Sequence, residues 1–280
     1  MMDKTKLLYL EDFSALTTAA RVEEVTEENS KSVVVLDATI FYPQGGGQPY
    51  DTGLMESDAG RFTPPLLKSP VSLGMKKSQN LQDSFREVSD YRERAGFIVE
   101  ETRFADGIVR HIGYFERGMF APGESVKLSV DEARRTLHSR LHSAGHAVDM
   151  AVATLGLPWT PGKGFHFPQG PYVEYGGSLD GLDKEKIKMD LEALCKRFIG
   201  ENLATKIIFP TSDEMKKIMA RNPAAIIPGD KPGRVVMFGS FGVPCGGTHV
   251  STTGAIGAIT IRKIKAEGVN IRVGYDVFSC

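Results

Sequence analysis

The chain has 280 residues, of which 41% are hydrophobic and 25% are charged, and its 34 Lys and Arg residues nearly balance its 35 Asp and Glu residues. Two domains of this combined length can each bury a core without disulfide bonds. No apolar run approaches the roughly 18 residues that a membrane-spanning helix needs, and the first residues lack the apolar stretch of a secretory signal. We therefore expect a cytoplasmic protein with no membrane partner, whose RNA contacts, if any, come from a local basic surface.

Residues 1–130 are predicted to form a small, mostly β domain. Runs rich in apolar and β-branched residues predict strands at 6–10, 32–41, 97–104, 107–115 and 125–130. The segment FYPQGGGQPYDTG, residues 41–53, places three consecutive glycines between prolines, which indicates unusual φ angles or close backbone approach. The stretch from about 57 to 96 has few apolar residues to bury, so we expect an insertion or a surface excursion there.

Residues 131–280 are predicted to form an α+β domain. A helix is expected from Asp131 to just before Gly156, since apolar residues recur every three or four positions between an acidic start and a glycine. A second helix is expected around 187–198, and TSDE at 211–214 fits a capping box that opens a third. Strands are predicted at 172–175, 234–238, 256–264 and 269–278.

Two pairs of metal-ligand residues lie about a hundred positions apart. His142 and His146 are four residues apart in the first helix, so both imidazoles reach one face. Cys245 and His249 form a second pair in CGGTH, where two glycines suit a tight turn that aims both side chains at one point. One thiolate and three imidazoles fit tetrahedral zinc, although the histidine pair alone is weak evidence.

Other features narrow the chemistry of this predicted site. The general-base Glu of a zinc-protease HExxH helix is absent, which disfavours peptide hydrolysis. His138 extends the helical row, and we favour a partly exposed or supporting position for it over ligation. His111 and His166 have no spacing partner, although folding could bring His166 to the site. The cysteines Cys195, Cys245 and Cys280 share no repeated spacing, so we predict no disulfide framework.

The motifs HSAGH, PCGGTHV followed by TTGAIG, and the upstream FYPQGGGQPYDTG together resemble the AlaX family of freestanding alanyl-tRNA editing proteins. This family shares its C-terminal domain with the editing domains of alanyl- and threonyl-tRNA synthetases, and its paired motifs hold zinc. The resemblance implies one Zn²⁺ ion held by His142, His146, Cys245 and His249. It also implies the medium-length form, in which the N-terminal domain is a small β-barrel.

The resemblance further implies a substrate-binding role for the glycine motif, whose matching residues are Gly45, Gly46, Gly47 and Gln48. The sequence departs from the family pattern at the 57–96 insertion, at Ala255, where an acidic residue is frequent, and at Ser143, where Thr is common. The last two departures bear on local contacts or on the choice of amino acid. No C-terminal oligomerisation extension is expected after Cys280.

The implied reaction is hydrolysis of the ester that joins serine or glycine to mischarged alanine tRNA. Four protein ligands would leave zinc no position for an activated water, so the water would be oriented by backbone groups, by Ser143 or Thr248, or by the tRNA ribose. Arg134, Arg135 and Arg140 are candidates for contacts with RNA, and equally for structural ion pairs. No nucleotide-binding signature is present, so we expect no use of ATP.

Two alternatives remain open on the sequence. The chain could be a zinc-stabilised tRNA-binding module that keeps the fold without turnover. It could also carry out the same editing reaction on threonine tRNA, since threonyl editing domains share the paired motifs. The GGGQ segment favours editing of alanine tRNA over editing of threonine tRNA.

Overall fold

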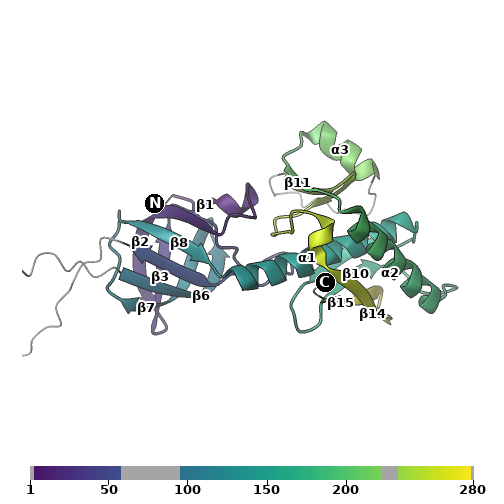
Figure 1. The fold of residues 1–280 in the computed structure, drawn as a ribbon, viewed down its shortest axis with the longest axis horizontal. Coiled ribbons are helices and arrows are strands. Elements are labelled where there is room, and N and C mark those ends of the chain that lie inside the picture. Colours follow the sequence, from purple (N-terminus) through teal and green to yellow (C-terminus); the bar gives the residue numbers. More distant parts are fainter. Residues whose placement is uncertain (1–2, 58–94, 222–232, 279–280) are drawn as a thin grey trace, which may run out of the picture. The chain divides into compact units, whose positions relative to one another are not determined.

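The computed structural model describes residues 3–57, 95–221 and 233–278, which form two compact units (Figure 1). The first unit contains residues 3–6 and 17–39 and the described part of 52–130. The second contains residues 7–16 and 40–51 and the described residues from Asp131 onward. The glycine-rich segment therefore clusters with the second unit, although it precedes residue 131. Nearly all of the expected insertion at 57–96 lies outside the described residues.

The first unit is a closed barrel of six antiparallel strands. In order around the barrel these are β2 (Thr17–Glu28), β3 (Lys31–Leu36), β7 (Ile108–Arg117), β6 (Ala95–Ala105), β5 (Gly53–Ser57) and β8 (Ser125–Val130). Alternate residues of β8 are buried, namely Val126, Leu128 and Val130, because successive side chains of a strand point to opposite faces. The sequence did not predict β2, where glutamates interrupt the β-branched pattern.

The expected strand at 6–10 is shorter than predicted. Strand β1 (Lys6–Leu7) pairs with β4 (Ala38–Thr39), and the chain then turns into the short 3₁₀ helix η1 (Leu8–Leu10). This turn buries Tyr9, whose ring meets that of Tyr42 edge to face at 5.2 Å. Burial of one aromatic ring has thus overridden the local strand pattern.

The second unit is built on a four-stranded antiparallel sheet with helices against it (Figure 1). Its strands, in order, are β14 (Ala258–Glu267), β15 (Asn270–Phe278), β10 (Tyr172–Gly176) and β9 (Thr160–Phe165). Helices α1 (Glu132–Thr154) and α2 (Lys184–Glu201) share one hydrophobic core with this sheet. Val148 and Leu191 of the helices and Ile261, Ile271 and Tyr275 of the sheet are fully buried in it.

The boundaries of the long helix agree with the sequence. The Asp131 side chain accepts a hydrogen bond from the Arg134 backbone N–H at 3.0 Å, which caps the start of α1. Gly156 follows the end of the helix with φ of 64°. The predicted α+β class is confirmed. Within the described ranges, no helix is both long enough and apolar enough to cross a membrane.

A smaller three-stranded sheet lies directly before one pair of the candidate ligands in the chain. It consists of β11 (Thr205–Ile208), β12 (Val235–Phe238) and β13 (Phe241–Pro244), and it is followed by the 3₁₀ helix η2 (Thr253–Ile256). Helix α3 (Ser212–Arg221) opens with the predicted capping box, since the Glu214 carboxylate accepts the Thr211 N–H at 2.8 Å. Because β13 ends at Pro244, the next residue, Cys245, begins the turn that leads to His249.

Candidate metal centre

Helix α1 places two imidazoles on one buried face. The ring centroids of His142 and His146 are 4.9 Å apart, and the two residues are 2% and 7% exposed. This is the geometry expected of residues four positions apart, which stand one helical turn above each other. The sequence between them is small, SAG, so no large side chain crowds the two rings.

The turn after β13 brings the second pair to the same point. The Cys245 Sγ atom lies 3.4 Å from His142 Nε2, and the His249 ring centroid lies 4.6 Å from that of His142. Gly247 makes this approach possible, because a Cβ there would lie 2.1 Å from His142 Cε1. A residue without a side chain is therefore required between the two ligands.

Four donor atoms, one each from His142, His146, Cys245 and His249, all lie within 4.8 Å of one another. Among the described residues, the Nε2 atoms of His146 and His249 are buried without a hydrogen-bond partner. Buried polar atoms are nearly always paired, and two that converge on one point could share a common partner such as a metal ion. The residues of this site thus fit a metal ion.

The opposite nitrogen of each imidazole is held by the protein. His142 Nδ1 lies 2.7 Å from Gln48 Oε1, and His146 Nδ1 lies 3.1 Å from Asp149 Oδ2. His249 Nδ1 lies 3.3 Å from the Ser143 hydroxyl. Partners of this kind fix the ring orientation of a metal-binding histidine and leave its other nitrogen free for the ion.

Electrostatics favour the metal-binding forms of His142, His249 and Cys245, whereas His146 would have to lose a proton to bind an ion. Burial and the neighbouring imidazoles hold the pKa of His142 and of His249 well below the ordinary value, so both are neutral. Burial opposes the charge on His146, but the nearby Asp149 and Cys245 outweigh burial and raise the pKa of His146 to about 10. Burial likewise raises the pKa of the Cys245 thiol, but His146 and the Gly247 N–H outweigh this and lower it. A lowered thiol pKa favours the thiolate, which is the ligand form.

The donor set is compatible with zinc. Bonds of 2.0 to 2.3 Å in a tetrahedral arrangement place neighbouring donors about 3.5 Å apart, close to the 3.4 Å between Cys245 Sγ and His142 Nε2. One thiolate and three imidazoles match the ligand preferences of that ion.

The glycine segment reaches this centre through one side chain. Gln48 is fully buried, and its carboxamide contacts His142, the Thr248 N–H at 3.1 Å and the Thr248 hydroxyl at 2.8 Å. Gly46 and Gly47 have φ of 51° and 76°, and a Cβ on Gly47 would lie 2.1 Å from the Gly164 carbonyl oxygen. The unusual backbone expected here is confirmed, and Gly45 pairs with Gln48 across the turn.

The two hydroxyl groups considered for catalysis are both fully buried. The Ser143 Oγ atom accepts the Val250 N–H at 3.1 Å, in addition to its contact with His249. The Thr248 hydroxyl lies 2.8 Å from both Gln48 Nε2 and Ser139 Oγ. Both hydroxyls are thus engaged in hydrogen bonds within the protein, and that of Ser143 contacts the candidate ligand His249.

Arg140 and His138 lie outside the four-residue donor group. The Arg140 guanidinium donates to the carbonyl oxygens of Ile256 at 2.8 Å and Phe278 at 2.7 Å. His138 is 2% exposed and lies outside the four-residue donor group, and burial and nearby arginines lower its pKa to about 4. Of the two positions considered for His138, the partly exposed one is wrong, and a supporting position agrees with its burial outside the donor group. His138 lies one turn before His142 on α1, and the face of the helix that carries His142 is buried at that turn as well.

His166 is brought to the site by folding alone. Its ring stacks on that of His142 with a centroid distance of 4.4 Å and an angle of 20°. Its Nδ1 lies 2.7 Å from the Tyr275 hydroxyl, which donates to the Leu141 carbonyl oxygen. Burial and the charge of His146 lower the pKa of His166 to about 3, so its ring is neutral. No spacing signal in the sequence could have identified this contact.

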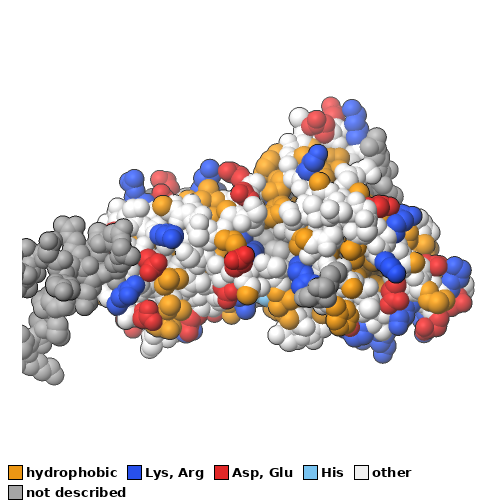
Figure 2. Space-filling model, in the orientation of Figure 1, with side chains coloured by type: hydrophobic (Ala, Val, Ile, Leu, Met, Phe, Trp, Pro, Cys, Tyr) orange, Lys and Arg blue, Asp and Glu red, His pale blue; other side chains and the backbone are white. Residues whose placement is uncertain are grey.

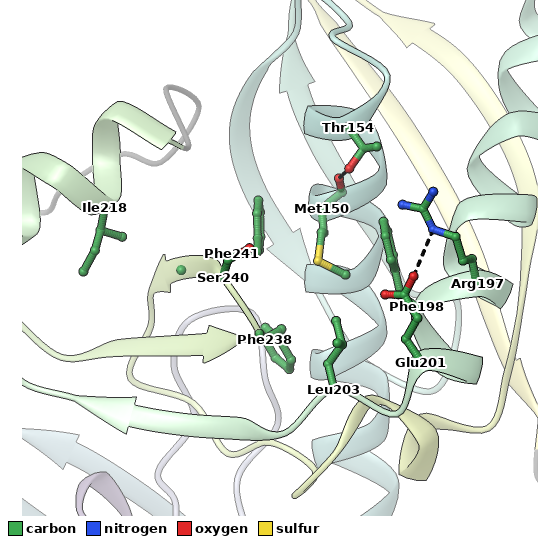
Figure 3. Close-up of a pocket in the computed structure, with 12 residues that line it drawn as sticks. Met150, Thr154, Arg197, Phe198, Glu201, Leu203, Ile218, Phe238, Ser240 and Phe241 are labelled. Atoms are coloured by element: carbon green, nitrogen blue, oxygen red, sulfur yellow. Dashed lines mark hydrogen bonds and ion pairs between the residues drawn. The ribbon is translucent and has the colours of Figure 1, made fainter.

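A cavity with both apolar and polar walls shares Phe238 with the environment of the imidazoles (Figure 3). The cavity has a volume of about 400 Å³, and Met150, Phe198, Leu203, Phe238 and Phe241 contribute to its walls. The Phe238 ring centroid lies 6.0 Å from that of His146 and 5.8 Å from that of His249. Phe238 therefore contacts the cavity on one side and the donor group on the other.

Two family models match parts of the chain that contribute to this centre. Residues 3–87 match the class II (A) tRNA synthetase family, and this range includes the glycine segment. Residues 234–273 match the second additional domain of threonyl and alanyl tRNA synthetases. The second match covers both Cys245 and His249.

Curated relatives span nearly the whole chain. The alanine–tRNA ligase of Methanobrevibacter smithii is 27% identical over 275 residues, which cover 93% of this chain and 25% of the ligase. The corresponding ligase of Bordetella petrii is 29% identical and covers 89% of this chain and 24% of its own length. The chain thus spans about a quarter of the length of these relatives. Together with the motif resemblance, these matches support a relationship of the chain to the AlaX-like proteins and to the editing domains of alanyl and threonyl tRNA synthetases.

Proposed function

We propose that this protein is an aminoacyl-tRNA deacylase that acts in trans on mischarged alanine tRNA and removes serine or glycine. The observation that carries the proposal is the buried group of three imidazoles and one thiol, with two unpartnered Nε2 atoms. This group lies partly within the segment that matches the threonyl and alanyl synthetase domain. In this proposal the protein acts in the cytoplasm without ATP, on tRNA charged by a separate ligase.

We favour alanine tRNA over threonine tRNA as the substrate because the relatives reported above are alanine–tRNA ligases. The ligases reported above are alanine ligases, and they match along most of this chain, including the glycine segment. The matched domain is by itself common to threonyl and alanyl synthetases. The choice between the two tRNAs therefore rests on the upstream part of the chain.

The proposed reaction is ester hydrolysis. A water oxygen bonds to the aminoacyl carbonyl carbon, the bond from that carbon to the ribose oxygen breaks, and the ribose oxygen takes up a proton. His142, His146, Cys245 and His249 would hold a zinc ion, which with four protein ligands supplies positive charge and shape without an open position for water. The products are a free amino acid and uncharged tRNA.

The attacking water is best oriented by backbone groups or by the ribose hydroxyl of the substrate. Ser143 and Thr248 are fully buried, and their hydroxyls are engaged with His249, Val250, Gln48 and Ser139. Use of either hydroxyl would require breaking these contacts. Their proposed contribution is to hold the ligands in place.

Recognition of the tRNA would depend on local groups. On the face shown in Figure 2, positive and negative side chains are interspersed, in keeping with a formal net charge of −1. The Arg134 guanidinium donates to the Tyr50 carbonyl oxygen at 2.9 Å, and that of Arg140 binds two carbonyl oxygens. These contacts favour structural roles for both arginines over contacts with phosphate.

A deacylation panel tests the proposal. Purified protein is incubated with Ser-, Gly- and Ala-charged alanine tRNA and with Ser-charged threonine tRNA, and the remaining ester is measured. We expect hydrolysis of the first two species while Ala-charged tRNA is spared. Binding of tRNA without hydrolysis of any species would contradict the proposal and favour a zinc-stabilised binding module. Preferential hydrolysis on threonine tRNA would contradict the alanine assignment.

A further inference from the structure

The segment from Ile40 to Asp51 is a loop closed at its base. The Asp51 N–H donates to the Tyr42 carbonyl oxygen at 2.9 Å, and the Tyr42 N–H donates to Asp51 Oδ2 at 2.7 Å. At the other end the Gln48 N–H donates to the Gly45 carbonyl oxygen at 2.8 Å. The backbone of the loop is thus constrained on both sides of Gln48.

Arg135 fastens this loop to helix α1. Its Nε atom lies 3.0 Å from Asp51 Oδ2 and 3.2 Å from Oδ1, and its two terminal nitrogens donate to the carbonyl oxygens of Ile40 at 2.6 Å and Phe13 at 2.9 Å. Arg135 is 3% exposed and Asp51 is fully buried. One guanidinium therefore binds both ends of the loop. The planar guanidinium of arginine directs several N–H groups at fixed angles, whereas the ammonium of lysine has no such fixed geometry.

The anchor and a candidate metal ligand share one face of α1. Arg135 and His142 are seven residues apart, which is close to two helical turns and about 10 Å along the axis. Arg135 holds the base of the loop, and Gln48 reaches back to His142 from within it. These contacts fix the position of the Gln48 carboxamide relative to α1, which carries His142.

The hydrogen bonds of Gln48 determine which nitrogen of His142 bears the proton. The Thr248 backbone N–H can only donate, so the Gln48 atom that it contacts at 3.1 Å is the carbonyl oxygen. That same oxygen lies 2.7 Å from His142 Nδ1, which must therefore carry a hydrogen. The His142 Nε2 atom is left with its lone pair, 3.4 Å from Cys245 Sγ.

We propose that Arg135, Asp51 and Gln48 form a positioning relay that holds His142 in its Nδ1-protonated form, with Nε2 directed to the metal. The relay rests on the metal site of the proposed function, and it adds three positioning residues to that site. None of the three contacts the substrate in this proposal. Their effect on the reaction passes through His142.

The first test replaces Gln48 and measures zinc affinity by competition with a chromophoric chelator. Gln48→Leu keeps the approximate volume but removes the acceptor, and we expect affinity to fall about 10- to 100-fold. Gln48→Glu keeps an acceptor for both N–H groups, and its affinity should stay within about threefold of the unmodified protein. An unchanged affinity in Gln48→Leu, or an equal loss in both variants, would overturn the proposal.

A second readout separates positioning from general support of the fold. Long-range proton–nitrogen NMR of the metal-free protein reports which nitrogen of His142 is protonated. We expect Nδ1 in the unmodified protein and in Gln48→Glu, and a shift toward Nε2 in Gln48→Leu. Thr253→Val is the matched control, because Thr253 is buried in the same unit and its hydroxyl bonds to backbone groups of Phe198 and Leu203. A shift of the proton in this control would also contradict the relay.

The contribution of the ion pair is tested by a double-mutant cycle on zinc affinity. Asp51→Asn should weaken zinc binding several-fold in the unmodified protein and less than twofold in the Gln48→Leu background, since the relay is already broken there. If the two substitutions reduce zinc affinity additively, the ion pair of Arg135 and Asp51 does not act through Gln48. If Asp51→Asn does not fold, Arg135→Lys takes its place in the cycle, because it keeps the charge and removes the fork.

The outcome is independent of the deacylation panel. A relay that controls zinc affinity in a protein that hydrolyses no aminoacyl-tRNA leaves the inference intact and removes the proposed function. Deacylation by a protein whose zinc affinity does not change when Gln48 is replaced supports the proposed function and removes the relay.

Discussion

The carbonyl oxygen of the Gln48 side chain lies 2.7 Å from Nδ1 of His142, although 94 residues separate them in the chain. This contact joins the glycine segment to the helix of the candidate metal centre. It gives the GGGQ motif a structural role that is separate from any contact with substrate. Each prediction below tests one part of the same centre.

Cys245 is expected to be required for metal binding. Cys245→Ala removes the only thiolate of the donor group, so zinc affinity should fall at least tenfold and bound zinc, measured by native mass spectrometry, should decrease. Cys195→Ala is the control, because Cys195 is buried in the hydrophobic core of the same unit, away from the donor group. Equal zinc content in the two variants would remove Cys245 from the ligand set.

Gly247 is expected to tolerate no side chain. In Gly247→Ala the new Cβ would lie 2.1 Å from His142 Cε1 and 3.0 Å from Gln48 Oε1, so the ring must move. Zinc affinity should fall about tenfold or more, and stability by about 1 to 3 kcal/mol. Gly246→Ala is a close control, since the nearest atom to its Cβ would be Leu10 Cδ2 at 4.0 Å. Similar affinities for both variants would show that the turn can relax.

Asp149 is expected to support His146. Asp149 Oδ2 contacts His146 Nδ1 at 3.1 Å, and its Oδ1 accepts the Tyr175 hydroxyl at 2.7 Å. Asp149→Asn removes the negative charge behind the imidazole, so zinc affinity should fall about tenfold. Asp190→Asn is the control, because Asp190 pairs with the exposed Lys186 on the surface of α2. Chelator competition that finds no difference between the two variants would rule out this role.

His111 is expected to make the barrel sensitive to acid. It is fully buried, with Nδ1 3.0 Å from the Val34 carbonyl oxygen and Nε2 2.9 Å from the Thr39 hydroxyl. Burial lowers its pKa from 6.5 to about 4, so the unfolded state binds a proton at higher pH than the folded state. The stabilisation is therefore complete above pH 6.5 and is lost as the pH falls toward 4, by on the order of 3 kcal/mol.

The measurement compares the unmodified protein with His111→Gln between pH 7 and pH 4. Hydrogen exchange of the amides of β3 and β7, followed in urea, reports the stability of the barrel itself. The variant is expected to be less stable at pH 7 and to lose less stability on acidification. Equal pH dependence in both proteins would show that His111 does not titrate as its burial requires.

Local patterns predicted the helices well and some strands poorly. The start of α1 at Asp131 and the capping box of α3 depend only on neighbouring residues, and both were predicted. Strand β9 (Thr160–Phe165) was not predicted, because its sequence, TPGKGF, has the composition of a loop. It is extended because β10 supplies hydrogen-bond partners along it. The preference of a strand is set largely by its neighbours in the sheet.

The sequence by itself determined the two ligand pairs, because residues four apart on a helix and residues flanking a glycine turn are brought together by local geometry. Only the tertiary structure decided that the two pairs meet, that His166 stacks on His142, and that Asp51 binds Arg135 from 84 residues away. These contacts arise from the packing of distant segments around α1, and no periodicity in the chain encodes them. For this reason the sequence predicted the candidate ligands, and the fold revealed the residues that contact them.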